Sequence, residues 1–116
     1  PCKALRFDFA DLDRGKTDAV LDAQDVPALD GYAELLVDPK SGQILGGTIV
    51  GKDAGEQLAP IALAMNQRIG LGSLGTLVLP YPTRSEYLRR LADAWNRTRL
   101  TPRAAGLLRW WLGRTR

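Results

Sequence analysis

Hydrophobic and polar residues alternate near the start of the chain. Leu5, Phe7 and Phe9 are separated by charged residues, and this period of two is typical of a half-buried β-strand. Residues 10–30, in contrast, are rich in Asp and show no sustained period. We therefore expect a first strand followed by an irregular connection.

Two further strand patterns cover residues 31–38 and 43–51. Between them lie Pro39, which presets φ for a turn, and Gly42, which tolerates a positive φ. This combination predicts a β-hairpin. Two consecutive glycines at 46–47 weaken the second strand, so we expect another backbone or a helix to pack closely against it.

The period changes to that of a helix after residue 52. Asp53 and Glu56 have the spacing of a capping box, and Gly70 is placed to cap the C-terminal end. We expect the apolar stripe of this helix to belong to the core or to a dimer interface. The stripe consists of Leu58, Ile61, Ala62, Met65 and Ile69.

The next segments predict a linker, a short strand and a helix. We interpret the glycine-rich residues 70–75 as linker, and the apolar segment Thr76–Leu79 as a buried strand. Thr83 and Glu86 form a second capping-box spacing. The helix that they begin has an apolar face made of Leu88, Leu91, Ala92 and Trp95.

A last helix begins at Thr101 and Pro102, with Thr as the N-cap and Pro at the first helical position. Its apolar face consists of Leu107, Leu108, Trp111 and Leu112. The order of elements predicts an α+β fold in which helices cover an antiparallel β-sheet. We expect one domain over residues 1–116, with residues 98–116 as a basic helical extension.

Charge is distributed unevenly, which the net charge of +3 conceals. Residues 1–83 hold 7 Lys and Arg against 11 Asp and Glu, a balance of −4; residues 84–116 hold 9 Arg against 2 acidic residues, a balance of +7. A basic tail can meet an anionic partner, although a solvated Arg-rich face is the simpler interpretation. We expect no nucleic acid partner, because no platform for base stacking is evident.

The residue types needed for self-contained catalysis are missing. The chain has no histidine, which excludes a histidine-based acid–base pair, triad or metal site, and its single cysteine, Cys2, excludes a dithiol centre and an internal disulfide. No Gly-x-Gly-x-x-Gly follows a strand pattern. We therefore expect no metal site, no cofactor bound by the isolated domain and no activity of this chain alone. We also expect a cytoplasmic protein, and the start at Pro1 suggests a domain excised from a longer one.

Several segments occur in an order that is specific in combination: Asp13-Arg14, Gly31–Asp38, Ser41–Gly51, Ala54–Glu56, Ile61–Met65 and Tyr81–Glu86. Together they resemble the dimerisation domain of the pyridine nucleotide-disulfide oxidoreductases, in which His-Pro-Thr-x-x-Glu stands at the last of these segments. The resemblance extends to the helix that ends near Trp95. It implies a homodimer interface within an enzyme that uses FAD and NAD(P)H.

The resemblance also implies roles for individual residues. In this family a His–Glu pair reaches the flavin and the redox disulfide of the other subunit, with His as acid–base and Glu orienting it. Glu86 matches that Glu and Tyr81 matches that His, so both are candidate catalytic residues in the intact dimer, and Pro82 is the candidate cofactor contact. An unperturbed phenol titrates at about 10, so Tyr81 can donate a hydrogen bond but exchanges protons poorly at neutral pH. Tyr81 between two prolines is most similar to the mercuric-reductase-like branch, where a His often precedes the motif; here Leu79 stands there.

Structural interpretations stand beside these roles. Glu86 also fits a capping residue, and Tyr81 fits a packed aromatic side chain. The leading functional hypothesis is a dimerisation domain that packs on the FAD and NAD(P) domains of its parent enzyme and contributes Tyr81 and Glu86 to the partner subunit's flavin-proximal site. The alternative is a stand-alone interaction or scaffold module whose basic C-terminal helix binds an anionic membrane surface or partner. For Trp110 and Trp111 we expect packing onto the parent enzyme ahead of membrane contact.

Overall fold

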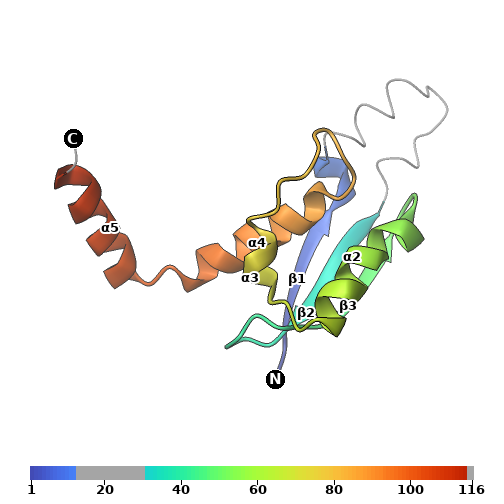
Figure 1. Ribbon diagram of the computed structural model, residues 1–116, viewed down its shortest axis with the longest axis horizontal. Coiled ribbons are helices and arrows are strands. Elements are labelled where there is room, and N and C mark those ends of the chain that lie inside the picture. Colours follow the sequence, from blue (N-terminus) through green and yellow to red (C-terminus); the bar gives the residue numbers. More distant parts are fainter. Residues whose placement is uncertain (13–30, 115–116) are drawn as a thin grey trace.

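The computed structural model describes residues 1–12 and 31–114. In these ranges the chain forms an antiparallel sheet and helices (Figure 1): β1 (Lys3–Asp8), the 3-10 turn η1 (Phe9–Asp11), β2 (Tyr32–Val37), β3 (Ile44–Val50), α2 (Ala54–Asn66), α3 (Leu71–Leu74), α4 (Glu86–Arg99) and α5 (Pro102–Arg114). The predicted α+β architecture is confirmed. Most of the predicted irregular connection, together with Asp13-Arg14, lies outside the described residues. None of the helices in the described ranges has the length and apolar character needed to cross a membrane.

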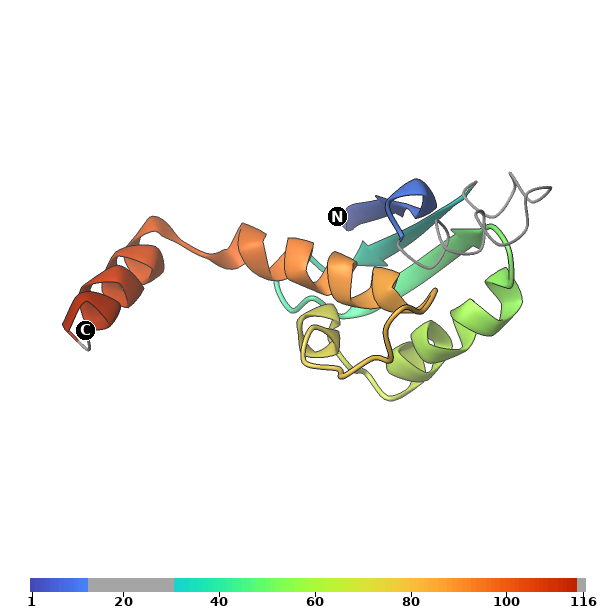
Figure 2. The same cartoon turned by 90° about the horizontal axis from the view of Figure 1, so that it is seen from above.

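The strands lie in the order β1-β2-β3, and both pairs are antiparallel. Alternate residues of β2 are buried (Ala33, Leu35 and Val37), as the period of two requires for one covered face. The helices α2, α3 and α4 lie on this side of the sheet (Figure 2). On the other face Leu36 and Val50 are exposed, so the sheet has one open side.

The predicted hairpin joins β2 and β3. Gly42 adopts the positive φ of 73°, and the backbone N–H groups of Lys40 and Ser41 both donate to Asp38 Oδ1 at 2.8 Å. These bonds, Ser41 first and Lys40 second, hold the pKa of the Asp38 carboxyl below its usual value because they stabilise the ionised form. The turn is therefore fixed by one carboxylate and one glycine.

Close packing at the strand glycines is confirmed for Gly47. A Cβ at this position would lie 3.2 Å from Ile61 Cγ2 on α2 and 2.9 Å from Leu35 Cδ2. At Gly46 the only neighbour in the described residues is Leu36, at an ordinary 3.8 Å. The absence of a side chain at 47 thus lets α2 approach β3.

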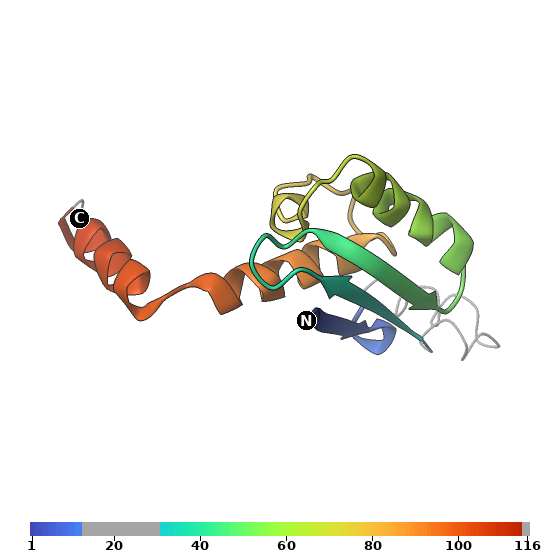
Figure 3. The ribbon, with the colours of Figure 1, turned by 90° about the horizontal axis from the view of Figure 1, so that it is seen from below.

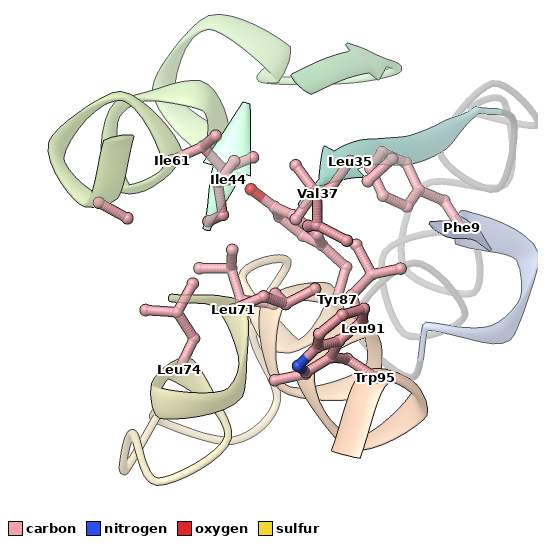
Figure 4. Packing of buried hydrophobic residues seen from close by; sticks show 14 of the residues in the cluster. Phe9, Leu35, Val37, Ile44, Ile61, Leu71, Leu74, Tyr87, Leu91 and Trp95 are labelled. Carbon is pink, nitrogen blue, oxygen red and sulfur yellow. The ribbon is translucent and has the colours of Figure 1, made fainter. Parts of the chain in front are cut away.

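The core lies between the sheet and the helices (Figure 4). The whole predicted apolar face of α4 is buried, namely Leu88, Leu91, Ala92 and Trp95. Tyr87, also buried, packs against Phe9 with ring centroids 5.9 Å apart and donates a 2.6 Å hydrogen bond to the Gln57 carbonyl. This residue therefore connects α4 with both η1 and α2.

The apolar stripe expected on α2 is only partly buried. Ile61 is buried and Met65 half-buried, whereas Leu58 is 40% exposed and Ala62 is also exposed. Ile69, 37% exposed, lies beyond the end of α2. Gln57 occupies a buried position instead, because its Nε2 donates to the Lys52 carbonyl at 2.7 Å. The buried face of α2 is consequently rotated from the predicted one, and part of the stripe remains at the surface.

The predicted helix caps at Asp53, Gly70 and Thr83 are wrong. Asp53 precedes α2 in a left-handed conformation, and its side chain does not cap the helix. Gly70 does not end α2, because Arg68 takes the positive φ after this helix and Gly70 precedes α3. The helix α4 begins at Glu86, after Ser85, and Glu86 N–H donates to the Thr83 carbonyl at 3.3 Å. In each case backbone geometry takes the place of the expected cap.

The predicted strand Thr76–Leu79 and the linker at 70–75 are also corrected. Leu71–Leu74 form the short helix α3, whose two leucines are buried, while Val78 is 96% exposed and outside any strand. Leu71 and Leu74 of α3 occupy the part of the core that the segment Thr76–Leu79 was expected to occupy. The segment after α3 is left at the surface.

Gly42 and Gly55 provide a matched test of the packing between the hairpin turn and Trp95 of α4. We expect Gly42→Ala to lower the free energy of unfolding by about 2 kcal/mol or more, because a Cβ would meet Trp95 Nε1 at 2.8 Å and φ is positive. Gly55→Ala adds a Cβ that meets nothing within 4 Å and should raise stability by up to about 1 kcal/mol. Urea denaturation measures both; equal effects would contradict the structure.

Candidate functional site

The segment between α3 and α4 carries the candidate site residues. It leaves α3 in a turn in which Thr76 Oγ1 donates to the Ser73 carbonyl at 2.8 Å, and the Tyr81–Pro82 peptide bond is cis. Near its end Arg84, with its side chain 11% exposed, has Nε 3.6 Å from Asp53 Oδ2. The segment is thus anchored to the start of α2 before it enters α4.

Tyr81 and Glu86 meet at one surface cavity. This cavity has a volume of about 290 Å³ and is lined by Leu79, Pro80, Tyr81, Glu86, Arg89, Arg90 and Asp93. Tyr81 is 73% exposed, so the prediction of a packed aromatic side chain is not what the structure shows. Pro82 is half-buried and does not line the cavity. The structure therefore brings together two of the three predicted site residues.

Glu86 is held by an arginine one helical turn away. Its Oε1 accepts hydrogen bonds from Arg90 Nε at 2.9 Å and lies 2.8 Å from Arg90 Nη2. Its Oε2 is buried and has no hydrogen-bond partner in the part of the chain that the structure describes. As the first residue of α4, Glu86 is also stabilised by the positive end of the helix dipole. Its carboxylate is consequently fixed at the wall of the cavity.

Arg89, Arg90 and Asp93 are site residues that the sequence prediction missed. Arg90 has a sequence signal, because Glu and Arg at i and i+4 form pairs on a helix surface. Arg89 and Asp93 carry the same signal, since they too form an i, i+4 pair of opposite charge. Together with Glu86 they give the cavity a wall of two cations and two carboxylates beside one phenol.

A second hollow of about 320 Å³ lies at the starts of α2 and α4. It is lined by Asp53, Glu56, Gln57, Thr83, Arg84 and Ser85. Cys2, which is exposed, lines neither this hollow nor the cavity at Tyr81. The charged and polar residues that line these two hollows thus lie around the segment between α3 and α4.

Residues 1–92 match the family model described as pyridine nucleotide-disulphide oxidoreductase, dimerisation domain. A dihydrolipoyl dehydrogenase from Chlorobaculum tepidum is 36% identical over 64 residues, which are 55% of this chain and 14% of the relative. A mercuric reductase from Shewanella putrefaciens is 29% identical over 84 residues, which are 67% of this chain and 15% of the relative. The chain thus spans about one seventh of these curated relatives.

The fold has counterparts among solved structures. The HOCl-induced flavoprotein disulfide reductase RclA from Escherichia coli, in its Cu(II) complex, superposes with a TM-score of 0.69 at 18% identity. The match covers 80% of this chain and 19% of that one. At this identity the likeness concerns the fold: a sheet with helices on one side.

Proposed function

Because the chain belongs to the dimerisation-domain family of the pyridine nucleotide-disulphide oxidoreductases, we propose that it brings Tyr81 and Glu86 to the flavin-proximal site of a partner subunit. The observation that carries this proposal is their position at one cavity of about 290 Å³. The two residues are separated in sequence by a cis proline and a turn, and the fold places both side chains at one surface. A surface cavity with a phenol and a fixed carboxylate suits a site that a second subunit completes.

The chemistry available to this cavity is that of hydrogen bonding and fixed charge. Tyr81 donates a hydrogen bond to a thiolate or a flavin oxygen presented by the partner subunit. Glu86 supplies negative charge, and Arg90 keeps its carboxylate in place without exchanging protons, because a guanidinium stays protonated. Where the family places a His–Glu pair, this chain therefore has a Tyr beside a Glu–Arg pair.

FAD and NAD(P)H are proposed to belong to the parent enzyme. A cavity of about 290 Å³ is at the lower limit for a small-molecule site, so these residues fit the edge of a flavin ring and not a whole dinucleotide. When bound, the flavin supplies electron transfer, and this chain contributes the cavity wall beside it. Pro82 does not line this cavity, so a flavin contact by Pro82 stays a prediction. The substrate would be selected by other parts of that enzyme, and a cytoplasmic location stays a prediction.

The surface of the domain supports a homodimer. Leu36, Leu45 and Val50 on the sheet strands and Leu58 beside the buried face of α2 are large apolar residues that are between 37% and 50% exposed. Such side chains are available to pack against another protein, and apolar residues that form a contiguous patch mark a contact of this kind. The remaining parent domains are proposed to cover the rest of it.

Leu58 and Leu63 test which face of α2 forms the dimer. At 100° per residue Leu58 and Leu63 lie on opposite flanks of the buried face of α2, about 90° and about 130° from its centre. We expect Leu58→Glu to raise the dimer dissociation constant about tenfold or more, and Leu63→Glu, 59% exposed in the chain, to leave it nearly unchanged. Sedimentation equilibrium measures both constants. A chain that is monomeric at all concentrations, or equal effects of the two variants, would contradict the proposal.

A further inference from the structure

Helix α5 lies apart from the body of the domain. A short connection at Leu100 and Thr101 joins it to α4, and in three views it projects beyond the sheet and the other helices (Figures 1, 2 and 3). The match to the family ends at residue 92. The dimerisation-domain assignment therefore does not account for α5.

The start of α5 is well defined by its sequence. The predicted N-cap is confirmed, since the Ala104 N–H donates to Thr101 Oγ1 at 3.3 Å. The helix has 13 residues and contains Gly106 and Gly113. Isolated helices of this length are marginal in water, and glycine weakens them further. A surface that buries its apolar face would supply the stabilisation that the helix lacks by itself.

Large apolar side chains form one face of α5, and they are exposed. The exposed fractions are 70% for Leu107, 49% for Leu108, 58% for Trp111 and 52% for Leu112. At 100° per residue these four positions fall on one side of the helix. Trp110 adds to three of them to line a hollow of about 310 Å³. This face is the part of α5 that a binding partner would cover.

Every charged residue at this end of the chain is an arginine. Residues 94–116 contain six Arg and no Asp or Glu. On α5, Arg103 and Arg114 flank the apolar face on the side of Trp110, and Arg109 lies beyond its other edge. The Arg114 guanidinium lies 5.1 Å from the Trp110 ring centroid. Positive charge thus borders the apolar face, and no negative charge offsets it within the segment.

We propose that α5 is an interfacial helix that attaches the protein to an anionic membrane surface. Its leucines and tryptophans enter the boundary between headgroups and acyl chains, and its arginines contact lipid phosphates. Tryptophan suits this boundary because its ring is apolar and its N–H is polar. Pairing of α5 with α5 of a second copy is disfavoured, because it brings arginines together without carboxylates to compensate. This role is independent of the proposed dimer site.

Vesicle co-sedimentation of the 116-residue chain tests the proposal. The probes are vesicles of phosphatidylcholine alone and of phosphatidylcholine mixed with phosphatidylglycerol. We expect at least about tenfold tighter binding to the anionic vesicles, with an affinity that falls as salt is added. Replacing Arg103, Arg109 and Arg114 together by Gln should remove this preference. Equal binding to both vesicles would overturn the proposal.

Two substitutions that introduce the same negative charge test whether the apolar face of α5, and not its opposite side, contacts the membrane. Leu108→Glu places a carboxylate on the apolar face and should abolish vesicle binding; Gly106→Glu places it on the other side, where a Cβ meets nothing within 4 Å, and should retain most of it. Thermal unfolding verifies that both variants keep the folded body. Equal vesicle binding by the two variants would overturn the proposal. So would lipid-independent self-association that Leu108→Glu alone removes, which would assign the face to a second copy.

Discussion

Replacing Tyr87 by alanine is expected to lower the free energy of unfolding by about 3–5 kcal/mol. Tyr87 is fully buried, and its side chain fills the space between the sheet and α2 (Figure 4). Alanine would leave a cavity beside Phe9 and remove the 2.6 Å hydrogen bond to the Gln57 carbonyl. Urea denaturation of the chain measures the loss. A change below about 1 kcal/mol would mean that the core collapses around the smaller residue.

Tyr87→Phe isolates the contribution of the hydroxyl. We expect a loss of about 1–2 kcal/mol, because a buried hydrogen bond between α4 and α2 is removed while the ring stays. Tyr81→Phe is the matched control. The Tyr81 side chain is 73% exposed, so its substitution should change stability by less than about 0.5 kcal/mol.

The stability that the unmodified chain has over Tyr87→Phe should depend on pH in a direction that follows from burial. Burial raises the pKa of Tyr87 above its ordinary value, because the phenolate is poorly solvated in the core. In the unfolded chain tyrosine ionises at about pH 10, so the contribution of Tyr87 is complete below that pH and falls as the pH rises above it. The difference in stability between the unmodified chain and Tyr87→Phe should therefore narrow above about pH 10. A difference that stays constant would contradict burial of the hydroxyl.

The parts of the fold that sequence patterns predict are those with one dominant local cause. The hairpin follows from Gly42, whose positive φ few other residues adopt readily. The buried face of α4 follows from four apolar residues at helical spacing, because no other arrangement removes all of them from water. In both places local preference and tertiary packing agree.

The failures occur where several local solutions compete. The spacing of Asp53 and Glu56 fits a capping box, yet Arg84, distant in sequence, lies close to the Asp53 carboxylate. Val78 is as apolar as a buried strand residue, but Leu71 and Leu74 of α3 occupy the core and Val78 is left exposed. Such outcomes depend on contacts between remote segments, which a local pattern does not contain.

The candidate site was predictable only in part. Tyr81 and Glu86 were identified by their place in a family motif, and the structure adds that both line one cavity. The Glu86–Arg90 pair has the i, i+4 spacing and could have been anticipated. Arg89 and Asp93 share that helix face by their spacing from Glu86 and could have been anticipated as well. Spacing does not specify that Leu79, Pro80 and Tyr81 lie beside this face, because that depends on how the segment before α4 folds.

In the proposed parent enzyme, Glu86→Ala is expected to reduce turnover by about 10- to 100-fold. The carboxylate lines the same cavity as Tyr81, and its removal leaves the proposed site without its fixed negative charge. Stability should fall by less than about 1 kcal/mol, because the ion pair that is lost involves Arg90, whose side chain is 52% exposed. Steady-state kinetics and an unfolding curve of the same preparation measure the two effects.

Arg90→Met is the matched control, because it breaks the same ion pair and keeps the carboxylate. If Glu86 acts at the partner subunit's flavin-proximal site, Glu86→Ala should slow turnover more than Arg90→Met. Arg90→Met should lose at least as much stability, because it leaves the largely buried carboxylate unpaired. If Glu86 only stabilises the start of α4, both variants should retain turnover and differ from the unmodified enzyme in stability alone. An equal fall in turnover would instead mean that the ion pair, and not the carboxylate by itself, is what the site requires.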